Sequence, residues 1–136
     1  MGTSYPSFAK INIGLKIVSR RKDGYHNLYT IFQELDFADF INIEKSDKGC
    51  NIKSDVDWIP INKKNICYKA YSFLKKEFDQ IKGVEIKIKK NIPVGAGLGG
   101  GSSNCAVVLK GLNSLYNLGL DNNNLQKIAL KLGADV

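Results

Sequence analysis

The stretch from Pro93 to Asn104 holds the residues of this sequence that are best suited to bind a phosphate group. Five of the seven residues from Gly95 to Gly101 are glycine, which adopts positive φ readily and lets a ligand approach the backbone closely. Two serines and an asparagine follow, and residues of these types are favoured where a helix begins. Because backbone amides that converge at a helix N-terminus bind anions, the stretch predicts a phosphate-binding loop.

Periodic apolar residues on both sides place this stretch between a strand and a helix. Val84, Ile86 and Ile88 alternate with other residues and predict a strand over 84–90, and apolar residues at helical spacing run from Ala106 to Tyr116. A flexible glycine linker is the alternative interpretation. Linkers rarely stand between two periodic elements with a proline at their start, so a loop of defined shape is favoured.

Three kinds of phosphate-binding loop can be compared with this stretch. A Walker A loop requires a lysine after its last glycine, and here Gly101 is followed by serine. Gly95, Gly97 and Gly100 match the dinucleotide pattern, but a polar turn and another helix replace the second strand that this pattern needs. The third pattern has Gly-Leu-Gly after Pro-x-x-x and ends in two serines. It is nearly complete here, and it resembles the phosphate loop of the GHMP kinases, a family of small-molecule kinases.

The first strand presents a lysine and an asparagine on one face. Residues 9–17 alternate strictly, with apolar side chains at the odd positions, so Lys10 and Asn12 project from the same, polar face. A solvated sheet face is the plain alternative for this pair. A turn follows at Asp23-Gly24, and Tyr25 and His26 come directly after it. These two rings could stack on a base and hydrogen-bond to it, or they could be chance members of a hairpin tip.

The rest of the chain reads as an alternation of short strands and helices. Strands are predicted over 28–35 and 40–44, with a short edge strand over 50–53. A helix follows the loop over 54–64 and is capped by Asn62 or Asn65. The last helix begins near Asp121 and ends at Gly133. The length of 136 residues suits one domain with a sizeable core.

Composition narrows the class of protein and its surroundings. The net charge of +7 favours anionic partners such as nucleotides, diphosphates or nucleic acid. The three cysteines form no C-x-x-C pair, which argues against a zinc site and favours reduced thiols in the cytoplasm. No apolar run approaches the length of a membrane span, so no membrane association is expected.

Motifs in a fixed order extend the resemblance along nearly the whole chain. Ala9-Lys10-Ile11-Asn12, Asp23-Gly24-Tyr25-His26, the glycine loop and Gly133-Ala134-Asp135-Val136 together resemble the N-terminal domain of the GHMP kinase of the non-mevalonate isoprenoid pathway. The resemblance implies an α+β fold, a two-layer α/β sandwich shared with a ribosomal-protein domain. Its mixed sheet carries helices on one face and contains an unusual left-handed crossover. It also implies that residues 1–136 form the ATP-binding domain, without the C-terminal domain of the family.

The resemblance also implies roles for individual residues. Asp135 matches the catalytic aspartate and Lys10 the lysine paired with it, while Asn12, Tyr25 and His26 match substrate-binding residues. The implied cofactors are ATP and Mg²⁺, with the Ser102 hydroxyl as the one candidate metal ligand from the protein. The implied ATP phosphate-binding residues are Pro93, Gly95, Ala96, Gly97, Leu98, Gly99, Gly100, Gly101, Ser102, Ser103 and Asn104, and the implied adenine-pocket residues are Asn65, Ile66, Lys90 and Val94.

The expected activity is ATP-dependent phosphorylation of a small cytidine diphosphate alcohol, with this chain supplying half of the enzyme and inactive alone. Two other classes stay open. One is a GHMP kinase with a different alcohol substrate, against which the Tyr25-His26 pair argues. The other is a nucleic-acid-binding domain of the same fold, which the charge of +7 encourages but which leaves the glycine loop and Asp135 without a purpose.

Overall fold

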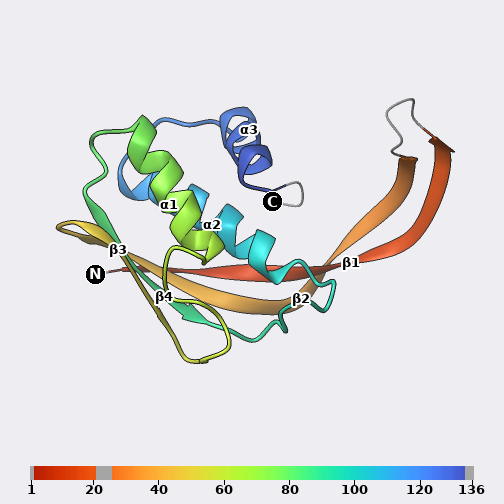
Figure 1. The fold of residues 1–136 in the computed structure, drawn as a ribbon, viewed down its shortest axis with the longest axis horizontal. Coiled ribbons are helices and arrows are strands. Elements are labelled where there is room, and N and C mark those ends of the chain that lie inside the picture. The colour runs from red at the N-terminus through yellow and green to blue at the C-terminus, as the bar shows by residue number, and fades with distance from the viewer. Residues whose placement is uncertain (1, 21–25, 134–136) are drawn as a thin grey trace.

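The computed structural model describes residues 2–20 and 26–133, with side chains for residues 2–11 and 33–133. No helix in these ranges is both long and apolar enough to cross a membrane. Four strands and three helices follow one another along the chain (Figure 1). In order they are β1 (Thr3–Arg20), β2 (His26–Ser46), β3 (Gly49–Ser54), α1 (Ile66–Glu77), β4 (Gly83–Lys89), α2 (Gly100–Leu115) and α3 (Asn122–Leu132).

The four strands form one mixed sheet with the order β1-β2-β4-β3. β1 pairs with β2 and β2 with β4 in antiparallel fashion, whereas β3 lies parallel to β4 at the edge. All three helices lie on the same side of this sheet (Figure 1). The predicted two-layer arrangement and the edge strand are therefore confirmed, and the handedness of the connection through α1 stays a prediction.

The second strand differs from its prediction. The sequence suggested two strands, over 28–35 and 40–44, but β2 is continuous from His26 to Ser46. Phe8 pairs with Ala38 and Lys10 pairs with Glu34, so residues 35–37 stand opposite a single residue of β1. This bulge interrupts the alternation of side chains without ending the strand, because the ladder resumes on both sides of it. The loss of strict alternation at the bulge was therefore wrongly interpreted from sequence as the end of one strand and the start of another.

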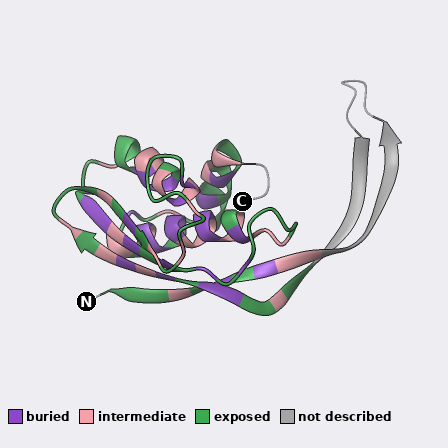
Figure 2. Cartoon of the chain, turned by 60° about the horizontal axis from the view of Figure 1, so that its bottom comes forward, coloured by how far each residue is buried: buried purple, intermediate pink, exposed green. Residues whose placement is uncertain are grey.

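The core lies between the sheet and the helices, where the buried residues of both layers meet (Figure 2). Full burial of one such aliphatic side chain contributes about 1.5–3 kcal/mol relative to leaving it exposed. Gly111 of α2 permits an especially close approach, since a Cβ atom there would stand 2.3 Å from Cδ1 of Ile43. The helix that follows the glycine loop is thereby seated directly on β2. The largest fully buried apolar side chains are Ile41, Ile43, Leu74, Ile81, Ile86, Ile92, Leu109, Leu112, Val84 and Val108.

Local signals at the helix ends operate as the sequence suggests. Asn65 caps α1, because its Oδ1 accepts a hydrogen bond from the amide of Cys67 at 2.8 Å. Asp121 caps α3 in a reciprocal arrangement with Asn124, and Gly133 ends that helix. These contacts satisfy backbone groups that a helix end leaves without partners. Of the two asparagines considered for α1, Asn65 is therefore the cap.

Candidate active site

The glycine loop connects the end of β4 to the start of α2. Gly95, Gly97 and Gly99 have φ values of +74°, +76° and +69°, a region that residues with a Cβ atom rarely adopt. Residues 93–97 are exposed, so the loop faces solvent. Gly99 is the N-cap of α2 and offers no side-chain hydrogen bond to the helix. The first amides of α2 are thus left to be satisfied by water or by an anion.

The start of α2 corrects one sequence-based prediction. Ser102, Ser103 and Asn104 were expected to open the helix as capping residues, but α2 already begins at Gly100. The left-handed conformation of Gly99 turns the chain into the helix, so these three residues belong to its first turns. Ser103 and Asn104 instead face inward, each with a polar side-chain atom 2.8 Å from Oγ of the buried Ser7. Ser102 is half-buried beside them.

Lys10 reaches the glycine loop from the first strand. Its backbone N–H donates to the carbonyl oxygen of Leu98 at 2.9 Å. Its side chain runs along Gly99, where an added Cβ atom would stand 2.8 Å from Cε of the lysine. Only glycine fits at that position without displacing the lysine. The fold therefore brings together two of the motifs that the sequence singled out, the lysine strand and the glycine loop.

The four residues assigned to an adenine pocket line one small cavity of about 160 Å³. Gly101 and Asn104 also line it, so this cavity adjoins the glycine loop. Two of its polar side chains already have partners: Asn65 caps α1 and donates to the carbonyl of Pro60, and Lys90 pairs with Asp39. Apolar groups such as Val94, which is 64% exposed, are therefore the ones that remain to contact a ligand. The complete lining is Ile59, Pro60, Lys64, Asn65, Ile66, Lys90, Val94, Gly101 and Asn104.

A buried ion pair beneath the loop was missed by sequence reasoning. Nζ of Lys90 lies 2.6 Å from Oδ2 of Asp39, and the two side chains are 2% and 0% exposed. Oδ1 of Asp39 accepts hydrogen bonds from the backbone amides of Asn91 at 2.7 Å and Ile92 at 2.8 Å. The sequence did contain a signal for the burial of Lys90. The inward-facing residues of β4 stand at even positions, and Lys90 occupies the next even position after the strand.

Several predicted site residues have no described side chain. The backbone of Asn12 pairs with Phe32, and that of His26 pairs with Arg20 at the start of β2. Tyr25 and Asp135 lie outside the described residues altogether. Their positions relative to the glycine loop stay predictions. Within the described part of the chain, no three His, Cys, Asp or Glu side chains gather as a metal site would require.

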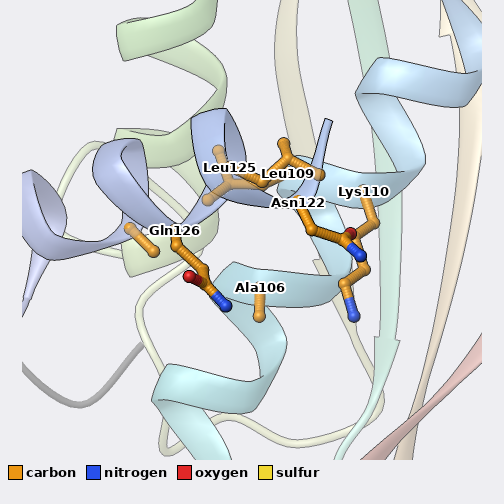
Figure 3. Close-up of a pocket in the computed structure, with 7 residues that line it drawn as sticks. Ala106, Leu109, Lys110, Asn122, Leu125 and Gln126 are labelled. Atoms are coloured by element: carbon orange, nitrogen blue, oxygen red, sulfur yellow. The ribbon is translucent and has the colours of Figure 1, made fainter. Parts of the chain in front are cut away.

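A second hollow lies between α2 and α3 and is separate from these residues (Figure 3). Its volume is about 320 Å³. Leu109 and Leu125 form part of its apolar wall, while Lys110, Asn122 and Gln126 supply polar groups (Figure 3). None of the sequence-predicted site residues lines it.

Comparison with protein families decides which of the three loop patterns is present. The model of the GHMP kinases N terminal domain matches residues 65–136, more than half of the chain, including the glycine loop. The chain belongs to the GHMP kinase family. Of the three loop patterns considered from sequence, the GHMP pattern is therefore the correct one.

Two curated relatives carry the same name. A protein of Clostridium botulinum (strain Eklund 17B / Type B) is 42% identical over 130 residues, and one of Caldicellulosiruptor bescii is 47% identical over 131 residues. Both are called 4-diphosphocytidyl-2-C-methyl-D-erythritol kinase, and each match covers 96% of this chain and 46% of the relative. The chain thus spans about half the length of the curated relatives it matches.

Solved structures agree with the family assignment. A crystal structure of 4-(cytidine 5'-diphospho)-2C-methyl-D-erythritol kinase matches with a TM-score of 0.86 and 40% identity, over 98% of this chain and 47% of that one. Homoserine kinase from Cytophaga hutchinsonii matches with a TM-score of 0.68 at 20% identity, over 95% of this chain and 40% of that one. The second likeness shows the fold alone. The predicted α+β fold of the GHMP N-terminal domain is confirmed.

Proposed function

We propose that this chain is the N-terminal, nucleotide-binding half of a 4-diphosphocytidyl-2-C-methyl-D-erythritol kinase. The reaction is transfer of the γ-phosphoryl group of ATP to the 2-hydroxyl group of the cytidyl substrate. The contact between Lys10 and the glycine loop at Leu98 and Gly99 carries the proposal, because it joins a cation to a ready anion site. Relatives at 42–47% identity support the choice of substrate within the family.

The glycine loop would hold the phosphates of ATP. Phosphoryl transfer proceeds through a loose transition state, so positioning and charge stabilisation supply most of the catalysis. The amides of the loop and of the first turn of α2 would stabilise the developing charge, and the N-terminal end of the helix dipole would add to their effect. Val94 and Ile66 at the adjoining cavity would pack against the adenine.

Lys10 and Asp135 would carry the acid–base chemistry. Asp135 would accept the proton of the attacking hydroxyl group as the new O–P bond forms and the bond from the γ-phosphorus to the β–γ bridging oxygen breaks, releasing ADP. The ammonium group of Lys10 favours the ionised form of that carboxylate and stabilises negative charge on the phosphoryl oxygens. Asn12 would lie beside the acceptor alcohol, and Tyr25 and His26 would hold the cytosine.

A magnesium ion fits the groups that are present. Mg²⁺ usually retains several waters and binds nucleotide phosphates with only one or two protein ligands. The described residues match that requirement, because they offer the half-buried Ser102 hydroxyl at the loop and no carboxylate cluster. The ion would neutralise charge on the phosphate oxygens.

The cysteines, all free, support a cytoplasmic location.

The proposal is tested by ADP formation in a protein that joins this chain to a C-terminal half of the kind its relatives carry. We expect turnover with the cytidyl substrate and none with homoserine or mevalonate, assayed in parallel. Turnover with one of those alcohols and not with the cytidyl substrate would agree with the family assignment but reject the proposed substrate. Absence of ATP binding would reject the nucleotide site itself.

A further inference from the structure

We propose that Asp39 is a positioning residue that holds the glycine loop in its phosphate-accepting shape. The proposal rests on the proposed function, since it deepens the account of the same loop. Asp39 lies on β2, outside every motif that points to the loop in sequence. Its side chain contacts residues that directly precede the glycine loop and a residue that follows it.

Asp39 stands in a polar row at one end of an otherwise apolar sheet face. It is the cross-strand partner of Ser7 on β1, and both residues are 0% exposed. Farther along β2, the inward positions are the buried Ile41 and Ile43. The row lies where the N-terminal turn of α2 covers the sheet, because Ser7 contacts Ser103. The change from apolar to polar residues therefore coincides with the end of the sheet next to the loop.

The carboxylate binds all three residues that lead from β4 into the loop. Oδ1 accepts the amide hydrogens of Asn91 and Ile92 at 2.7 and 2.8 Å. Oδ2 lies 2.6 Å from Nζ of Lys90. The side chain of Asn91 adds a return contact, donating to the carbonyl of Ala38 at 2.8 Å. These bonds set the direction in which the chain leaves the sheet.

Asn104 connects the same carboxylate to the other end of the loop. In the orientation that satisfies both its polar atoms, its amide nitrogen donates to Oδ2 of Asp39 and to the carbonyl of Gly100, each at 3.0 Å. Its oxygen accepts from Nζ of Lys90 at 3.2 Å. Both ends of the loop are thus held by one buried carboxylate.

The exposed part of the loop has open space beside its glycines. Gly95 and Gly97 have positive φ, and a Cβ atom added at either would meet nothing within 4 Å. Glycine also loses more conformational freedom on ordering than any other residue. Fixing both ends before a ligand arrives reduces the entropy that binding must overcome. Asp39 acts in this way without touching the nucleotide.

The competing explanation is that Asp39 and Lys90 only stabilise the fold. A single substitution cannot separate the two explanations, because it leaves a buried charge without its partner and destabilises the whole domain. Two neutral double variants can separate them. Asp39→Asn with Lys90→Met keeps an oxygen that accepts from Asn91 and Ile92. Asp39→Val with Lys90→Met removes that acceptor, and valine suits a strand.

The test measures melting temperature and the affinity for Mg²⁺ with a non-hydrolysable ATP analogue by calorimetry, for the parent chain and both double variants. Because both variants lack Lys90, which lines the cavity beside the loop, the Asn/Met variant is the reference for the Val/Met variant. The Val/Met variant should bind about tenfold more weakly or worse, the scale of a hydrogen bond left unmade. Equal affinities in two folded variants would overturn the proposal.

Hydrogen exchange keeps the proposal separable from the proposed function and from a folding failure. Without nucleotide, amides of residues 95–101 should exchange faster in the Val/Met variant than in the Asn/Met variant, and equal rates would overturn the role of Asp39 even if the parent binds no nucleotide. If the Val/Met variant does not fold, hydrogen exchange in the parent chain tests the proposal instead. Without nucleotide, the amides of Asn91 and Ile92 should then exchange far more slowly than those of residues 95–101, and rapid exchange at Asn91 and Ile92 would overturn the proposal.

Discussion

The backbone N–H of Lys10 donates to the carbonyl oxygen of Leu98 at 2.9 Å, and this bond joins the first strand to the glycine loop. The aliphatic part of the lysine side chain then runs along Gly99. A candidate catalytic cation is thereby placed beside the start of α2 by strand geometry, rather than by residues close to it in sequence.

Substitution of the loop glycines should abolish nucleotide binding. Gly97→Val places a β-branched residue at a φ of +76°, and Gly99→Val also drives a side chain into Lys10. Calorimetry with an ATP analogue measures the effect. Gly49→Val is the matched control, because Gly49 has a φ of +73° with open space around it and lies near the opposite end of β4. Unchanged affinity in both loop variants would remove the assignment.

Loss of Lys10 or Asp135 should act on chemistry more than on ATP binding. In the full-length protein, Lys10→Ala and Asp135→Asn should each lower kcat by roughly 10²-fold or more, the usual scale for an acid–base or electrostatic group. ATP affinity should change much less for Asp135→Asn. Steady-state kinetics with calorimetry in parallel separates the two effects. An Asp135→Asn variant with parental turnover would rule out its catalytic role.

Tyr25 should determine affinity for the cytidyl substrate. Stacking of a base on an aromatic ring contributes about 1–3 kcal/mol, so Tyr25→Ala should weaken that substrate about tenfold to a hundredfold. Tyr25→Phe keeps the ring and serves as the control, with affinity close to that of the parent. Binding of the ATP analogue should stay the same in both. Equal losses for the two ligands would point to a folding defect instead of recognition.

The thiols should make stability fall at alkaline pH. Burial raises the pKa of Cys105 to about 12 and that of Cys50 to about 12, and burial with nearby Cys105 and Cys50 raises the pKa of Cys67. Unfolded thiols titrate near pH 8.5, so above this pH the unfolded chain holds fewer protons than the folded chain. The free energy of unfolding must then decrease as pH rises toward 12.

Urea unfolding at pH 8 and pH 10 measures this decrease. The decrease should be smaller in a Cys105→Ala variant than in the parent, because one of the three raised thiols is gone. Iodoacetamide at pH 8 provides an independent check, since it should label the folded chain far more slowly than the urea-unfolded one. Rapid labelling of Cys67 and Cys105 in the folded chain would contradict their burial.

The 136-residue chain alone should bind ATP weakly and show no kinase activity. Its glycine loop, adjoining cavity and Lys10 lie within one domain, so a phosphate site can form without another chain. Orientation of the acceptor alcohol and exclusion of water can account for roughly 7–11 kcal/mol of barrier reduction, and we assign these tasks to the second half. ADP formation is measured for the chain alone and after mixing with a C-terminal-half polypeptide. Robust turnover by the chain alone would contradict this division of labour.

Local chemistry was enough to predict the glycine loop, the start of α1 and both ends of α3 from sequence. Positive φ at Gly95, Gly97 and Gly99, the Asn65 cap and the Asp121 cap depend on residues within a few positions of one another. Glycine tolerance and side-chain capping operate over that range whatever the rest of the chain does. The family pattern could therefore be read directly from the letters of the sequence.

Tertiary structure alone decided which distant residues meet. The continuity of β2 depends on a bulge that forms only in register with β1, and the Asp39–Lys90 pair exists only because β2 and β4 are neighbours. The contact of Lys10 with Leu98 likewise needs the whole sheet in place. A buried charge is stable only beside its partner, and neither segment by itself shows which partner strand pairing will supply.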